Sequence, residues 1–198
     1  MIIPEGQMSQ IERDYIYKTI KNSNVKVALE SGTWYGGGST LSITKGLTET
    51  NGILYTYEEC NQFYNVAKNF YHNSEYINNI RLFNSSFIDG LSELSEEFYK
   101  SIDFILLDGG DELPNGSHKH DTIKYLENFN ISENVQSFKI LENKIKIGCD
   151  ILLHDWTINV GRGNFVKRYL ETSNNINNFQ LINVIDTTTG LAHLKKIK

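Results

Sequence analysis

Four short apolar runs separated by longer amphipathic stretches limit the fold of this chain more than any other feature. The runs are VKVAL (25–29), ILYTYE (53–58), IDFILLD (102–108) and DILLHD (150–155). The last two are continuously apolar and end in a carboxylate, which is typical of central parallel strands covered on both faces. Strands that alternate with helices in this way predict a doubly wound, mostly parallel α/β sheet with helices on both faces.

The stretches around these runs predict the remaining elements. Ser9 is expected to cap a helix that ends near Asn22. Further elements are expected as helices at 39–48, 60–72, 88–99 and 165–172, and as a weaker strand at 77–84. Residues 179–186 and 191–198 predict an antiparallel C-terminal hairpin with a short turn that contains glycine.

The chain has 198 residues, and the alternation continues through it without an internal repeat or a linker. Its 39% hydrophobic and 22% charged residues are typical of a globular protein. We therefore expect a single domain over residues 1–198. The segment near 109–148, between the two central strands, is longer than one crossover helix requires. We expect it to contain an insertion over one edge of the site.

Charge and hydropathy argue against several kinds of partner. The chain has 19 basic and 24 acidic residues and a net charge of −5, without a basic block, so nucleic-acid binding is not expected. No run approaches the roughly 18 apolar residues of a membrane helix, and the first residues do not resemble a signal peptide. Cys60 and Cys149 are expected to be reduced thiols of a cytoplasmic protein. The oligomeric state stays open, with a homodimer as one option.

Polar and small residues are expected to gather where the parallel strands end, because ligands of open α/β sheets bind there. These residues follow the strands in turn as Glu30 to Gly38, Glu58 and Glu59, Asn84 to Phe87, Asp108 to Glu112, and His154 to Thr157. Carboxylates, glycines and small hydroxyls suit a ligand with ribose hydroxyls and an ammonium group better than one with several phosphates.

The glycine-rich stretch ESGTWYGGGST (30–40) does not fit two common nucleotide sites. The dinucleotide pattern G-x-G-x-x-G fails because Trp34 stands where the second glycine is needed after Gly32. A phosphate-binding P-loop fails because Gly38 replaces its lysine. The remaining pattern, E-x-G-x-x-x-G, lets the backbone pass close to a ligand, and Ser39 can begin the next helix. A tight strand-to-helix turn without a ligand is the alternative interpretation.

Four segments in chain order resemble the motifs of class I S-adenosylmethionine-dependent methyltransferases. They are VALESGTWYGGGST, ILYTYEE, FILLDGG and ILLHDW. Of these, ESGTWYGGG and LLHDW are similar to the small-molecule O-methyltransferase branch that includes the macrocin O-methyltransferases. The resemblance implies a Rossmann-like fold, S-adenosylmethionine as cofactor, and methyl transfer to an oxygen of a small molecule or glycan precursor.

The resemblance also implies roles for individual residues. The residues expected to contact the cofactor are Glu30, Gly32, Thr33, Gly36, Ser39, Glu58, Ser86 and Asp108. Glu58 would bind both ribose hydroxyls through charge-assisted hydrogen bonds, with Glu59 as the neighbouring alternative. Asp108, His154 and Asp155 are expected at the reacting end. There, His154 or Asp155 would serve as the base for the acceptor.

Mg²⁺ is a further candidate cofactor, because related catechol-type and macrocin-type enzymes hold it with two aspartates. Asp108 and Asp155 match these positions, and carboxylate oxygens suit the ion. Trp156 stands where the catechol-type enzymes have an asparagine ligand, so Asp111, Glu112 or another residue of the long loop would have to supply the missing oxygen. Elsewhere in the insertion, His118 and His120 form an H-K-H pattern that is more typical of polar loop residues than of a metal site.

Three other functions stay open beside methyl transfer. A non-catalytic protein could bind the same cofactor or use the fold structurally, since a fold does not define a function. An aminopropyltransferase-type enzyme could use a related sulfonium, although the sequence contains no evident pair of acidic residues for a diamine. An NAD-dependent oxidoreductase is disfavoured by the glycine spacing.

Overall fold

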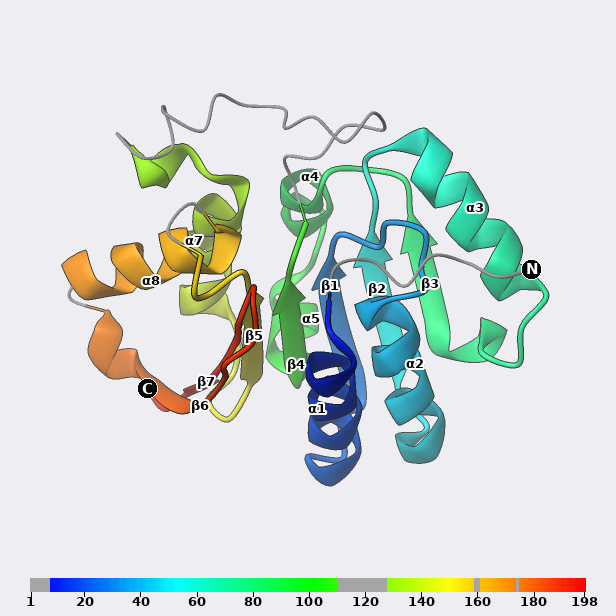
Figure 1. Cartoon of the computed structure of the whole chain (residues 1–198), viewed down its shortest axis with the longest axis horizontal. Helices are drawn as coiled ribbons and strands as arrows, with labels where there is room; N and C mark the ends of the chain where they lie inside the picture. Colours follow the sequence, from blue (N-terminus) through cyan, green and yellow to red (C-terminus); the bar gives the residue numbers. More distant parts are fainter. Residues whose placement is uncertain (1–7, 110–127, 159–160, 174) are drawn as a thin grey trace.

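The computed structural model describes residues 8–109, 128–158, 161–173 and 175–198. These residues form a seven-stranded sheet in the order β3-β2-β1-β4-β5-β7-β6 (Figure 1). The strands are β1 (Val27–Ser31), β2 (Ile53–Tyr57), β3 (Ile80–Phe83), β4 (Phe104–Leu107), β5 (Asp150–His154), β6 (Phe179–Ile185) and β7 (Leu191–Lys196). Neighbours from β3 to β5 pair in parallel, whereas β7 pairs antiparallel with β5 and β6. The predicted sheet and its C-terminal hairpin are confirmed.

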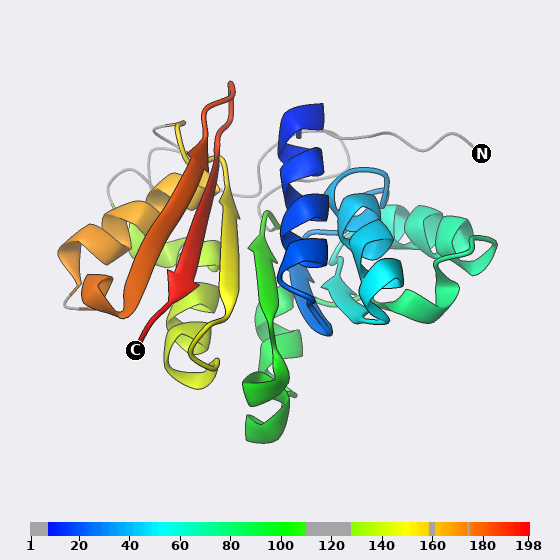
Figure 2. The same ribbon diagram turned by 90° about the horizontal axis from the view of Figure 1, so that it is seen from below.

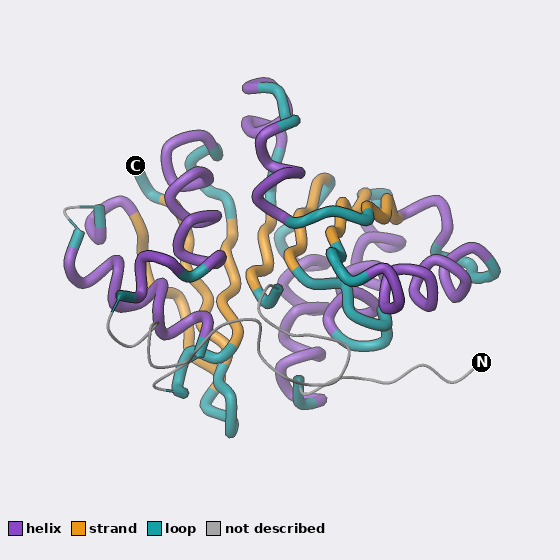
Figure 3. The backbone as a smooth tube through the Cα atoms, turned by 90° about the horizontal axis from the view of Figure 1, so that it is seen from above, coloured by secondary structure: helices purple, strands orange, loops and turns teal. Residues whose placement is uncertain are grey.

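Helices cover both faces of this sheet. They are α1 (Gln10–Asn22), α2 (Ser39–Thr50), α3 (Asn61–His72), α4 (Phe87–Ser92), α5 (Glu96–Ser101), α7 (Glu133–Lys144) and α8 (Arg162–Thr172), with short 3-10 turns at Ile77–Asn79, Phe129–Ile131 and Ile176–Asn178. Figure 2 shows α1 beside α2. In Figure 3 the strands form the middle layer between helices. None of the described helices is long and apolar enough to cross a membrane.

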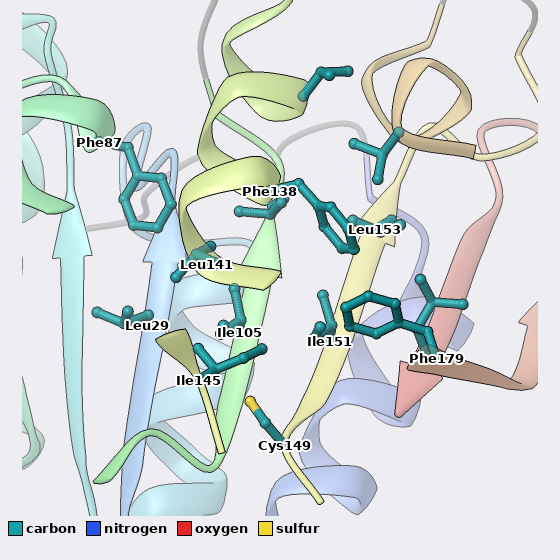
Figure 4. Close-up of a cluster of buried hydrophobic side chains, with 14 of the residues drawn as sticks. Leu29, Phe87, Ile105, Phe138, Leu141, Ile145, Cys149, Ile151, Leu153 and Phe179 are labelled. Carbon is teal, nitrogen blue, oxygen red and sulfur yellow. The ribbon is translucent and has the colours of Figure 1, made fainter. Parts of the chain in front are cut away.

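Alternation along the strands builds the two cores. On one face, Ile105 and Ile151 pack with Phe138 of α7 and with residues of α4, α5 and α8, and Figure 4 shows these three side chains in one cluster. On the other face, Leu106 and Leu152 pack with residues of α1 and α2. Successive strand residues point to opposite faces, so continuously apolar strands are required when both faces are covered.

Ser9 caps α1, as its position before the helix predicts. The Ser9 hydroxyl accepts from the backbone N–H of Glu12 at 3.3 Å, and the Ser9 N–H donates to Glu12 Oε2 at 2.7 Å. This reciprocal capping box satisfies two backbone groups that the first turn would otherwise leave without partners. Glu12 is fully buried, so it lies within the fold rather than on its surface.

Two helices differ most from the prediction, while the helix expected at 39–48 ends at Thr50 and the strand expected at 77–84 is shorter, at Ile80–Phe83. The single helix expected at 88–99 is two helices, α4 and α5, because Ser95 caps a new one by accepting from the N–H of Phe98 at 3.2 Å. The helix expected at 165–172 begins three residues earlier, at Arg162. This earlier start brings Arg162 into the first turn of α8, next to the end of β5.

The long segment between β4 and β5 is described only in part. The described part of this segment contains α7, a helix that lies between these two strands in the chain. Residues 110–127 lie outside the described part of the chain, and with them the expectations for Asp111, Glu112, His118 and His120. The insertion and the single domain stay predictions. Cys60 and Cys149 are both free thiols.

Candidate functional site

The carboxyl ends of the parallel strands lie in line at one edge of the sheet. Ser31 at the end of β1 is paired with Tyr57 of β2 and Leu107 of β4, and Leu107 is paired with Leu153 of β5. The residues that follow these positions are therefore neighbours across the sheet. They include Gly32, Glu58, Asp108 and His154, as the sequence predicts for the rim of an open α/β sheet.

Gly32 lies where the chain leaving β1 meets the chain leaving β4. Its φ is +89°, and a Cβ at this position would lie 2.6 Å from the Cα of Gly109. Two backbones this close leave no room for a side chain. The glycine at 32 is thus required by the close approach of the two backbone segments that follow β1 and β4.

Gly36 meets a side chain of α3 instead. A Cβ on Gly36 would lie 2.8 Å from Cε2 of Tyr71, and the Tyr71 hydroxyl donates to the carbonyl of Gly36 at 2.7 Å. Packing against Tyr71 is sufficient to explain this glycine. Contact with a cofactor at Gly36, as expected from the sequence, stays a prediction.

Glu30 is buried beneath the glycine-rich loop and is surrounded by hydroxyl groups. Its carboxylate accepts from Ser39 Oγ at 2.6 Å, Thr40 Oγ1 at 2.8 Å and Thr56 Oγ1 at 2.8 Å. Thr33 joins the group through Thr56, with the two hydroxyl oxygens 2.5 Å apart. The predicted site residues Glu30, Thr33 and Ser39 therefore lie together, bound to the protein rather than open at the rim.

Burial raises the pKa of Glu30 to about 7, even though the hydroxyl donors oppose the shift. An acid with a raised folded-state pKa stabilises the fold fully only below its unfolded pKa, so stability is lost as the pH rises from about 4.5 to about 7. We expect this loss to reach about 3 kcal/mol, and Glu30→Gln to remove it because the amide stays neutral. Urea unfolding at several pH values measures how the free energy of unfolding changes with pH in the wild type and in Glu30→Gln. Equal slopes in Glu30→Gln and the wild type would contradict this assignment, and Glu59→Gln on the surface is the control.

Glu58 links the end of β2 to the glycine-rich loop. One carboxylate oxygen accepts from the backbone N–H of Trp34 at 2.8 Å, and the other accepts from the N–H of Cys60 at 2.8 Å. Trp34 has a φ of +51°, so the loop turns its N–H toward this carboxylate. Glu59, the alternative to Glu58, is exposed. Glu58 is thus the better placed of the two to face a ligand beside the loop.

Ser86 lies after β3 and caps α4. Its hydroxyl accepts from the N–H of Asp89 at 3.1 Å and donates to Asp89 Oδ2 at 2.7 Å. Close by, Phe83 stacks on Tyr57 with ring centroids 4.9 Å apart. Tyr57 is 5% exposed and Phe83 is 38% exposed, so Phe83 is the ring of this pair that reaches the surface. Ser86 thus lies between the end of β3 and the start of α4, and its contact with a cofactor stays a prediction.

A charged cluster joins the ends of β4 and β5 to the start of α8. Asp108 Oδ1 is 2.8 Å from His154 Nδ1 and 2.9 Å from Arg162 Nη1. The same Nη1 also donates to the Asp108 carbonyl. Both partners are mostly buried, since the side chains of His154 and Arg162 are 4% and 19% exposed. Asp108 is therefore held between two cationic side chains.

The second nitrogen of His154 faces residues from the two ends of the chain. His154 Nε2 is 3.0 Å from Thr189 Oγ1 and 3.9 Å from Glu12 Oε1. Glu12 Oε1 in turn accepts from the hydroxyl of Thr187. Both ring nitrogens thus have protein partners. This geometry suits a residue that positions Asp108 better than a base that meets the acceptor.

The cluster shifts the pKa values of its members in different directions. Burial alone would lower the pKa of His154, but the adjacent Asp108 carboxylate raises it to about 9. The pKa of Asp108 is lowered, because His154 and Arg162 outweigh its burial. Burial and then the charge of Asp108 raise the pKa of Asp155. His154 is accordingly a cation at neutral pH, and Asp155 is the carboxylate of the cluster that takes up a proton more readily than usual.

Asp108 and Asp155 do not fit Mg²⁺ in this arrangement. Ligand atoms of Asp108, His154 and Asp155 lie within 4.8 Å of one another, which is close enough for an ion. However, Arg162 contacts Asp108 Oδ1 and lies 3.7 Å from Asp155 Oδ2 through its Nε. The positive charge that a divalent ion would supply to these carboxylates is already present, and Mg²⁺ demands near-ideal oxygen coordination.

Three members of this cluster, Arg162, Glu12 and Thr189, are not predicted by the sequence. Arg162 follows β5 by eight residues, and its only signal is its place in the first turn of the next helix. Glu12 is visible in the sequence as half of a capping box, and Thr189 as part of a turn. Neither pattern indicates that Glu12 and Thr189, which are 177 positions apart, both lie beside His154.

The fold is that of known methyltransferases. The chain is similar to an O-methyltransferase from Bacillus cereus in complex with SAH, with 17% identity, a TM-score of 0.74, and coverage of 98% of this chain and 84% of that one. It is also similar to TomG from Streptomyces achromogenes, an O-methyltransferase involved in tomaymycin synthesis and solved with SAM, with 14% identity, a TM-score of 0.74, and coverage of 99% and 84%. A comparison with curated protein sequences gave no significant match.

The sequence model of the O-methyltransferase family matches residues 2–128. This match covers more than half of the chain, so the protein belongs to the O-methyltransferase family. The predicted class, an S-adenosylmethionine-dependent methyltransferase with a Rossmann-like fold, is thereby confirmed. The family does not specify the acceptor.

Proposed function

We propose that this protein binds S-adenosylmethionine and transfers its methyl group to a hydroxyl oxygen of a small molecule. The observation that carries the proposal is the position of the Glu58 carboxylate, at the end of β2 and against the loop that follows β1. The solved relatives with SAH and SAM bound support the same cofactor.

Two backbone N–H groups hold the Glu58 carboxylate in place. Its oxygens accept from the N–H of Trp34 and from the N–H of Cys60. In this proposal the two hydroxyls of a ribose donate charge-assisted hydrogen bonds to the same carboxylate. Loop and helix α3 thus orient the carboxylate before the cofactor arrives.

Asp155 is the group best suited to accept the proton of the acceptor. It follows His154 at the rim, its side chain is 12% exposed, and burial and Asp108 raise its pKa. Methyl transfer requires the acceptor oxygen to align with the sulfonium carbon and to lose its proton. In this proposal Asp155 takes that proton and Asp108 faces the methionine end of the cofactor, while His154 positions Asp108.

Aromatic rings beside the loop suit an acceptor that contains a ring. Trp34, Tyr35 and Phe63 meet edge to face, with centroid distances of 4.6 Å between the first two and 4.7 Å between the last two. Such rings commonly form the walls of small-molecule sites. A glycan precursor as acceptor and a homodimer as the assembled form remain parts of the proposal.

Changing Glu58 to alanine is expected to weaken S-adenosylmethionine binding by about 1.5–3 kcal/mol, the usual contribution of a hydrogen bond to a charged group. Isothermal titration of the wild type and the variant with S-adenosylmethionine and S-adenosylhomocysteine measures this change. The matched control is Glu59→Ala, which removes the exposed neighbour and should leave both affinities unchanged.

The same titrations distinguish the alternatives. An unchanged affinity in Glu58→Ala together with a loss in Glu59→Ala would move the ribose site to Glu59. Tighter binding of decarboxylated S-adenosylmethionine would favour an aminopropyltransferase. Absence of binding by the wild type would contradict the proposed function and favour a structural role for the fold.

A further inference from the structure

Arg162 occupies the space between the two aspartates of the rim. Its Nη1 is 2.9 Å from Asp108 Oδ1, and its Nε is 3.7 Å from Asp155 Oδ2. The side chain is 19% exposed, so most of the guanidinium is shielded from water. Opposite charges interact more strongly where water is excluded. One fixed cation therefore contacts both carboxylates that could otherwise share a metal ion.

The backbone around Arg162 holds it in this position. Gly161 and Gly163 flank it at the start of α8. A Cβ on Gly161 would overlap the carbonyl oxygen of Asp155, and a Cβ on Gly163 would overlap that of His154. The first turn of α8 thus packs backbone to backbone against the end of β5. This close approach fixes the Cα of Arg162 relative to Asp155 and is independent of the ion pairs themselves.

The donor chemistry differs from that of a divalent cation site. Mg²⁺ and Mn²⁺ need several oxygen ligands around the ion, but Asp108 Oδ1 already accepts from His154 and Arg162. Trp156, after Asp155, offers no oxygen from its side chain. A divalent ion between the aspartates would have to displace the guanidinium or lie beside it, and the two positive charges would repel.

We propose that Arg162 replaces the divalent cation at this rim and makes methyl transfer by this protein independent of metal. This inference rests on the proposed function. In the step it serves, the S–CH₃ bond of the sulfonium breaks, the O–CH₃ bond forms, and the hydroxyl proton passes to the Asp155 carboxylate. The products are a thioether, a methyl ether and protonated Asp155. Arg162 keeps Asp108 and Asp155 in place and supplies the positive charge that favours loss of the proton.

Binding of Mn²⁺ by the full chain tests this proposal without an acceptor. The electron paramagnetic resonance signal of free Mn²⁺ is titrated with the wild type, Arg162→Ala and Arg162→Gln. We expect both variants to bind Mn²⁺ at least about tenfold more tightly than the wild type, because removal of the guanidinium leaves two carboxylates without it. A merely structural role of Arg162 would give no such gain. The control is Arg168→Ala on the same helix, whose guanidinium lies 4.9 Å from the ring centroid of Phe129 and should not affect Mn²⁺ binding.

The proposal would be overturned if the wild type binds Mn²⁺ as tightly as the two Arg162 variants do, or more tightly. The two substitutions are both included because glutamine keeps more of the side chain if alanine prevents folding. S-adenosylhomocysteine titrated into the same wild-type sample reports on the proposed function separately. If the wild type does not bind S-adenosylhomocysteine, the proposed function is contradicted. The difference in Mn²⁺ binding between the wild type and the Arg162 variants still tests the role of Arg162 in that case.

Discussion

Asp108→Asn is expected to lower the free energy of unfolding by about 3–5 kcal/mol, the usual cost of removing one partner from a buried ion pair. The asparagine has nearly the same shape, but it carries no charge to balance the two cations that Asp108 contacts. His154 and Arg162 would remain mostly buried, at 2.8 and 2.9 Å from a neutral oxygen or amide. Urea unfolding at neutral pH measures the change.

A double substitution separates the charge from the shape. Arg162→Gln in the Asp108→Asn background removes one of the two unbalanced cations, so the double variant should be more stable than the sum of the single effects predicts. Additive losses would show that Asp108 and Arg162 do not interact energetically, and would contradict the geometry of the cluster.

Gly32→Ala is the second substitution with a large expected effect. The residue has a φ of +89°, where an L-residue costs roughly 1–2 kcal/mol, and the new Cβ would lie 2.6 Å from the Cα of Gly109. Overpacking of this kind adds about 1–3 kcal/mol. We therefore expect a total loss of about 2–5 kcal/mol in the free energy of unfolding, measured by urea denaturation.

Gly148→Ala is the matched control for this change. Gly148 has a φ of +90°, but a Cβ there has nothing within 4 Å. Alanine at 148 should therefore show the backbone strain alone, about 1–2 kcal/mol. The difference in stability between the two variants measures the cost of placing a methyl group between the backbone segments that follow β1 and β4. Similar losses at both positions would indicate that these segments can make room for a methyl group.

The sheet could be predicted from the sequence because its signals are local. Strands β4 and β5 are covered on both faces, so their residues are continuously apolar and stand out against the amphipathic helices. The cap at Ser9 is equally local, since both halves of the capping box lie within one helical turn. The order of rim residues then follows from the parallel topology, which brings strand ends to one edge.

The partners within the site could not be predicted in the same way. Asp108 and Arg162 are 54 positions apart, and only the packing of α8 against β5 brings them together. Glu30 is a second example. Its place before the glycine-rich loop predicts contact with a ligand, but its buried carboxylate accepts hydrogen bonds from three hydroxyl groups of the protein. Such outcomes depend on tertiary contacts, which a pattern along the chain does not contain.

The place of β7 in the sheet has a consequence for the order in which the protein assembles during its synthesis. Chains emerge from the ribosome with the N-terminal part first, yet β7 comes last of the strands and lies between β5 and β6. Thr189, just before β7, is also the partner of His154 Nε2. The nascent chain can build β1 to β5 early, but the final hairpin must join the edge of β5 before the imidazole gains its second partner. The contact between His154 and Thr189 is therefore completed only after β7, which ends at Lys196, has been synthesised.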